Sequence, residues 1–135
     1  KLRDPRLAAL SELTANASLA WAVTPITTVN AGFETTFDST TIAGASGSVG
    51  RTVRAGIDHE LMRNLVLSSE VSHEWNDYPG ITLAEETTVA SVDGEYWLNR
   101  HAALVAGFEH ETQTTNDGSG TVRENVVSVG VKVRN

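Results

Sequence analysis

The chain has no cysteine among its 135 residues. This absence excludes a disulfide framework and a thiolate metal site. The chain also has no apolar run of about 20 residues, the length that a membrane-spanning helix requires. If the chain crosses a membrane, β-strands must make the crossing.

Bulk composition leaves the class of protein open. The first residues, KLRDPRLAAL, lack the pattern of a signal peptide, so any export signal has been removed or lies outside these residues. The net charge of -7 argues against nucleic acid as a partner. The mean hydropathy of -0.16 suits a soluble β-protein and equally a lipid-facing barrel, because alternating apolar and polar residues cancel in the average.

Alternation with period two runs through most of the chain and breaks where glycine, proline, asparagine, aspartate and serine gather. It predicts an all-β protein, an antiparallel up-and-down meander that forms a transmembrane β-barrel or part of one. The chain is expected to be a single domain over residues 1–135, with an external segment at 1–11 and the meander at 12–134. The predicted strands are 12–23, 26–38, 50–61, 65–77, 86–98, 101–114 and 123–134.

The predicted connections alternate strictly in length. Short ones fall at Thr24-Pro25, at 62–64 and at Asn99-Arg100, and long ones at 39–49, 78–85 and 116–122. Outer-membrane barrels have short periplasmic turns and long external loops, so this alternation is typical of them.

Each strand divides into an apolar and a polar set of residues, and we expect the polar set to face the lumen of a barrel. The predicted lumen-facing bases are Arg54, Lys132 and Arg134. The predicted lumen-facing acids are more numerous: Glu34, Asp38, Asp58, Glu60, Glu70, Glu74, Asp93, Glu95, Glu109 and Glu111. An acidic wall would favour cations in a conduit. The alternative is a polar plug of paired charges and water without a through-pathway.

Aromatic residues lie near both ends of the predicted strands. Trp21 and Tyr96 are near short turns, and Phe37 and Trp75 are near long loops. We expect these residues to form two aromatic girdles, one at each membrane interface.

A soluble β-sandwich that serves as a binding module of the periplasm or cell surface is the alternative interpretation, with the apolar faces as its core. The predicted strands are about 11 to 14 residues long, whereas strands of globular sheets commonly have about 5 to 6. A tilted strand needs about 9 to 11 residues to cross a bilayer, so strand length favours the barrel.

No enzymatic chemistry, cofactor or metal is expected. Neighbouring strand residues point to opposite faces, so His73 and Glu74 cannot form one site through adjacency. The same holds for His110 and Glu111. His101 has lumen parity, but it lies at a short turn, away from Ser72, and no motif links it to a serine.

Several segments resemble one family. They are Asp4 to Leu7, Val23 to Val29, the Thr40 to Ser48 loop, the run Asp58-His59-Glu60-Leu61-Met62-Arg63-Asn64-Leu65, and the Leu98-Asn99-Arg100 turn. Together they resemble the proteobacterial outer-membrane β-barrel proteins of the putative β-barrel porin family. The resemblance implies the outer membrane of a Gram-negative bacterium and a porin-like channel or a structural role in an envelope assembly. The implied partners are outer-membrane lipid and, in an assembly, other envelope proteins or further copies of the chain.

The chain departs from that family in two respects. Members are usually longer, and outer-membrane barrels commonly end in an aromatic residue, whereas this sequence stops at Asn135. If the segment at 1–11 is external, an even-stranded barrel with a periplasmic N-terminus would also need at least one more strand upstream. We therefore expect a C-terminal fragment of a longer barrel.

Overall fold

Seven β-strands make up the regular structure of the part of the chain that the structure describes. The structure is a computed structural model that describes residues 14–39, 45, 47–118 and 120–134; the predicted external segment at 1–11 lies outside them. None of the described residues forms a helix long and apolar enough to cross a membrane. The strands are β1 (Asn16–Thr24), β2 (Thr27–Asp38), β3 (Ser48–Met62), β4 (Leu65–Asp77), β5 (Ala84–Trp97), β6 (Ala102–Thr115) and β7 (Gly120–Val133).

All seven strands belong to one sheet in the order β1-β2-β3-β4-β5-β6-β7, each antiparallel to the next. The predicted all-β meander is confirmed. The alternative sandwich is wrong, because a sandwich packs two sheets face to face and the described strands form only one. Among the described residues no backbone pairing joins β1 to β7, so the sheet is open at these two edges.

The strand ends at the long connections differ from the prediction. The pairs Asp38↔Ser48, Asp77↔Ala84 and Thr115↔Gly120 continue the ladders beyond the last alternating apolar residues. Backbone hydrogen bonds hold these residues in the sheet, although most of them are polar or glycine. β3, β5 and β7 therefore begin earlier than predicted.

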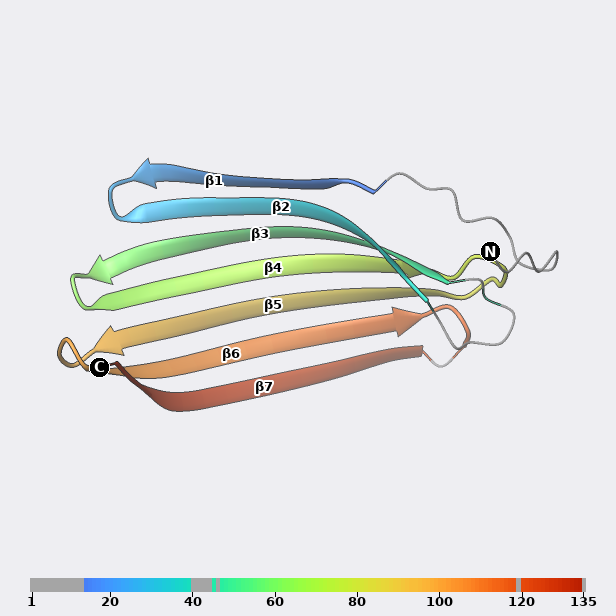
Figure 1. Cartoon of the computed structure of the whole chain (residues 1–135). Helices are drawn as coiled ribbons and strands as arrows, with labels where there is room; N and C mark the ends of the chain where they lie inside the picture. Colours follow the sequence, from blue (N-terminus) through green and yellow to red (C-terminus); the bar gives the residue numbers. More distant parts are fainter. Residues whose placement is uncertain (1–13, 40–44, 46, 119, 135) are drawn as a thin grey trace.

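The short turns lie together at one end of the sheet and the long connections at the other (Figure 1). In the β1–β2 turn the Ile26 amide donates to the Thr24 hydroxyl at 3.3 Å. In the β5–β6 turn the Asn99 carboxamide oxygen accepts from the amides of His101 and Ala102 at 2.8 and 3.0 Å. Such side-chain bonds satisfy backbone donors that the strand ladders leave free.

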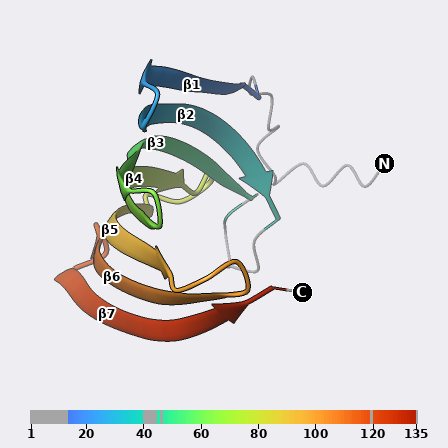
Figure 2. The ribbon, with the colours of Figure 1, turned by 90° about the vertical axis from the view of Figure 1, so that its left-hand side faces the viewer.

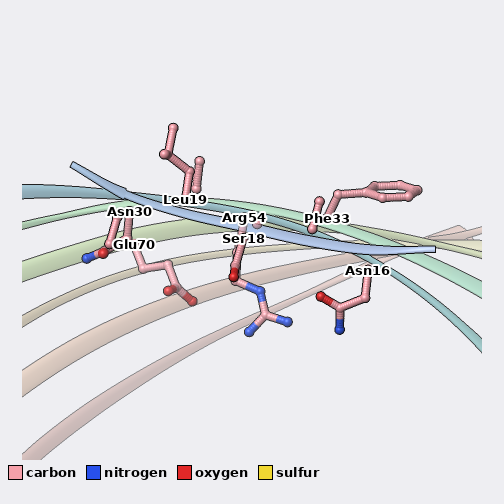
Figure 3. A pocket seen from close by; sticks show the side chains of 11 residues that line it. Asn16, Ser18, Leu19, Asn30, Phe33, Arg54 and Glu70 are labelled. Atoms are coloured by element: carbon pink, nitrogen blue, oxygen red, sulfur yellow. The ribbon is translucent and has the colours of Figure 1, made fainter.

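The sheet curves into an open trough, which is seen along its strands in Figure 2. Figure 3 shows Ser18, Arg54 and Glu70 on the side toward which the rest of the sheet curves, with Leu19 and Phe33 on the other side. Most of the charged side chains therefore lie on the concave face, and most of the large apolar ones lie on the convex face.

Glycines relieve crowding on the concave face. A Cβ at Gly32 would lie 3.0 Å from Cγ of Arg54, and one at Gly56 would lie 3.1 Å from the carbonyl oxygen of Ser69. One at Gly107 would collide with the Asp93 carboxylate. Side chains converge inside a curved sheet, so large polar residues need small neighbours there.

The described part of the sheet has almost no core. Val49 and Ala103 are its buried hydrophobic residues, and Thr35 is its buried polar one. Large apolar side chains stand exposed instead, mainly on the convex face: Leu19, Trp21, Val53, Ile57, Leu67, Val71, Trp75, Val92, Tyr96, Leu104, Phe108, Val127, Val129, Val131 and Val133. An apolar surface of this extent marks a site that another apolar phase or molecule covers.

Candidate functional site: the acidic concave face

The cross-strand register places every predicted lumen-facing acid on the same face of the sheet. Direct neighbours share a face, and the pairs that fix this include Glu34↔Thr52↔Glu74, Asp58↔Ser68↔Asp93 and Glu70↔Ser91↔Glu109. Asp38, Glu60, Glu95 and Glu111 follow from the two-residue period of their strands. That this face lines a lumen stays a prediction.

Two predicted bases on this face form ion pairs. Nη2 of Arg54 lies 2.9 Å from Oε2 of Glu34, and Nζ of Lys132 lies 2.8 Å from Oε2 of Glu95. Lys132 also stands over the Trp97 ring, 5.7 Å from its centroid. The third predicted base, Arg134, follows the end of β7. All four members of these pairs are partly exposed, so each pair stabilises the sheet by at most about 1 kcal/mol.

Asp58 accepts two side-chain hydrogen bonds on the concave face. Its carboxylate accepts from Nδ2 of Asn30 at 2.8 Å and from Oγ of Ser68 at 2.6 Å. Glu70 and Asp93 line the same hollow. The hollow is therefore polar and carries negative charge.

A second hollow lies toward the β1 edge, where the concave face is less acidic. Figure 3 shows Asn16, Ser18 and Asn30 beside Arg54 and Glu70. Amide and hydroxyl groups gather here around one guanidinium and one carboxylate. The strongest negative charge therefore lies further along the sheet, over β3 to β6.

Two acids of the same face were missed by the sequence reasoning. Glu124 lies opposite Glu111, and Glu85 lies opposite Asn76. The two-residue period of β7 was sufficient to find Glu124. Glu85 was assigned to a loop, because β5 begins earlier than its apolar pattern does.

Tyr78 follows the end of β4, at the long-connection end of the sheet. Its hydroxyl donates to Oε2 of Glu85 at 2.8 Å. The pKa of Tyr78 is raised above its ordinary value, first because of this hydrogen bond to a carboxylate, then through partial burial and the charges of Glu85 and Glu74. No sequence motif predicted this contact, because it depends on the path of the β4–β5 connection.

The convex face carries the predicted interface aromatics. Trp21 lies opposite Val29 and Tyr96 opposite Leu65, near short turns, while Phe37 lies opposite Val49 and Trp75 opposite Arg51, near long connections. Their role at a membrane interface stays a prediction.

Charged residues on the convex face of the described strands are confined to the long-connection end. They are Arg51, Asp77, Glu86 and Arg123, and Arg51 forms an ion pair with Asp77 at 3.0 Å. From these residues to the short turns the convex face carries no carboxylate, lysine or arginine. The uncharged part thus forms a band across the sheet.

The strand histidines lie on the convex face, and each has a neutral partner. His59 contacts Thr27 at 2.9 Å, His73 contacts Thr88 at 2.7 Å, and His110 contacts Asn125 at 2.8 Å. Within the part of the chain that the structure describes, no three histidine or carboxylate side chains gather in a way that could hold a metal ion.

Comparison with protein families gives a match over the whole chain. The family model described as Putative beta-barrel porin 2 matches residues 1–135. No curated protein and no solved structure gave a significant match.

Proposed function

Because the chain belongs to the Putative beta-barrel porin 2 family, we propose that its sheet is an arc of a β-barrel wall in the outer membrane of a Gram-negative bacterium. The convex apolar face lies against lipid, and the concave face lines a water-filled pore that favours cations. The proposed role includes no enzymatic step, in keeping with the description of the family as a porin.

The observation that carries this proposal is the separation of the two faces. The exposed apolar side chains would be costly in water, but they need no protein partner in a bilayer. The strands have 9 to 15 residues, enough to cross the hydrocarbon core when tilted. The carboxylates of the other face remain hydrated only if that face borders water.

Further strands complete the proposed barrel. Strand edges exposed to lipid would leave backbone amides and carbonyls without partners, which a bilayer does not tolerate. β1 and β7 are such edges in the described sheet. The sheet is therefore proposed to be part of a larger wall, as in a longer member of the family.

The location is tested first by fractionation of the native protein. We expect extraction to require detergent and the folded band to shift on a gel after heating. A freely soluble, heat-insensitive protein would refute the membrane location.

The pore is tested by conductance across a planar bilayer with a salt gradient. An acidic wall predicts a reversal potential with the sign that a cation-selective channel gives in that salt gradient. Replacing Glu70 and Glu109 with glutamine should move this potential toward zero, because both carboxylates face the proposed pore on either side of Ser91. Glu86→Gln is the matched control, since Glu86 lies on the convex face.

An anion-selective channel would refute the role of the concave acids. Protein that inserts but never conducts would instead support a structural role in an envelope assembly, with other envelope proteins or copies of the chain as partners.

A further inference from the structure

The short-turn end of the sheet carries an excess of positive charge. Arg63, Arg100 and Arg134, the basic rim, are exposed there, and the linking residues 25–26, 63–64 and 98–101 include no carboxylate. Among the described residues none of the three arginines forms an ion pair. At the opposite end the carboxylates outnumber the bases, because Asp38, Asp77, Glu85, Glu86 and Asp117 lie there together with Arg51 and Arg123. The two ends of the sheet thus differ in the sign of their charge.

Hydrogen bonds between neighbouring turns hold the basic rim together. The Trp97 amide donates to the Asn64 carbonyl at 2.8 Å, and Nδ2 of Asn64 donates to the Trp97 carbonyl at 3.0 Å. The Arg134 amide donates to the His101 carbonyl at 2.9 Å. The first two bonds fix the β3–β4 turn, which carries Arg63, to β5. The third brings Arg134 beside the β5–β6 turn, which carries Arg100.

Apolar side chains accompany the basic rim. Met62 and Leu98 are 57% and 56% exposed. Leu98 also lines a shallow hollow together with Arg100, Arg134, Trp97, Asn64 and Asn99. Two guanidinium groups, two carboxamides and an exposed apolar side chain therefore border one hollow, and none of the residues that line it is acidic.

We propose that the basic rim binds the headgroups of anionic phospholipids in the leaflet at the short-turn end, an inference that rests on the proposed membrane barrel. A guanidinium group binds two phosphate oxygens through two parallel hydrogen bonds. The arginines of the basic rim therefore favour a directly bound phosphodiester over loosely associated counter-ions. Met62 and Leu98 favour a lipid over free phosphate, because their exposed apolar surface can contact acyl chains while the arginines reach the headgroup.

Tryptophan fluorescence offers a local test. The chain has three tryptophans, of which Trp21 and Trp97 lie near the short turns and Trp75 near the other end. With Trp75→Phe in the native protein, quenching by brominated lipids reports on the short-turn end. Vesicles of brominated phosphatidylglycerol and of brominated phosphatidylcholine give the relative binding of an anionic and a zwitterionic lipid.

We expect several-fold tighter binding of phosphatidylglycerol. Arg63→Gln and Arg100→Gln should each lower this preference by up to about fivefold, the effect of one basic residue near an anionic surface. Arg123→Gln is the control, because it removes the same charge near the acidic end and should leave the preference unchanged.

Equal binding of the two lipids, or a preference that survives both substitutions, would overturn the proposal. A preference abolished by inorganic phosphate, but not by chloride at equal ionic strength, would assign the rim to free phosphate and would also overturn it. Absence of quenching by either lipid would instead contradict the membrane barrel itself, so the two failures are distinguishable.

Discussion

Replacement of Val92 by arginine measures whether the convex face lies against lipid. Val92 is near the middle of β5, is 53% exposed, and has Ser69 and Phe108 as its cross-strand neighbours. An arginine on the lipid side near the bilayer centre costs about 2 to 4 kcal/mol, which lowers the folding constant by about 30- to 900-fold. At an exposed position in water the same change would stay within about 0.5 kcal/mol.

The adjacent residue gives the matched control. Ser91 lies on the concave face between Glu70 and Glu109. An arginine at Ser91 would meet two carboxylates in a hydrated setting, so its effect on the free energy of unfolding should stay within about 0.5 kcal/mol. The two variants introduce the same charge one residue apart in the same strand and differ only in the face that receives it.

The assay is urea unfolding of the native protein refolded into phospholipid vesicles, followed by tryptophan fluorescence. The proposal requires Val92→Arg to be less stable than Ser91→Arg by at least about 2 kcal/mol. Equal stability of the two variants would refute the assignment of the faces, because an open sheet in water would not distinguish them.

Further measurements test individual contacts of the concave face. Gly56→Ala should be less stable than Gly94→Ala by about 1 kcal/mol in urea unfolding. A Cβ at Gly56 would meet a backbone carbonyl at 3.1 Å, whereas a Cβ at Gly94 would meet a flexible Leu67 methyl at 3.4 Å. The opposite order of stability would contradict the crowding argument. Lys132→Met should cost at most about 1 kcal/mol and should change the emission of Trp97, since it removes both the Glu95 ion pair and the cation over the ring; an unaltered spectrum would exclude that contact. The Tyr78 hydroxyl stabilises the fold only while it is protonated, and its pKa is raised above 10. The difference in unfolding free energy between wild type and Tyr78→Phe should therefore be constant near neutral pH and fall as pH rises through that raised pKa. A difference that grows with pH would contradict the raised pKa.

Much of the fold follows from side-chain alternation. A strand that alternates Val127, Val129 and Val131 with Ser128 and Lys132 has two unlike faces, and a shift of one residue in its pairing would exchange them. The register in the structure keeps like faces together from β1 to β7. The grouping of the acids was therefore predictable from the sequence, as was the number of strands.

Alternation does not reveal which face is concave or where the ladders end. Gly32, Gly56 and Gly107 mark the concave face, but their meaning depends on the large neighbours that the register places beside them. The early start of β5 depends on the Asp77↔Ala84 and Asn76↔Glu85 pairs, in which three of the four residues are polar. These features arise from contacts between strands, whereas alternation is a property of each strand alone.

The directions of the two edge strands constrain how any barrel containing this arc can close. β1 and β7 both run from the long-connection end to the short-turn end (Figure 1). Pairing them with each other, or with the opposite edge of a second copy in the same membrane orientation, would form a parallel ladder, which is slightly less stable per residue. A wall that is antiparallel throughout needs an odd number of strands between these edges, because each added strand reverses direction. Such a wall has an even number of strands in total, whatever its diameter, and an added hairpin preserves that parity.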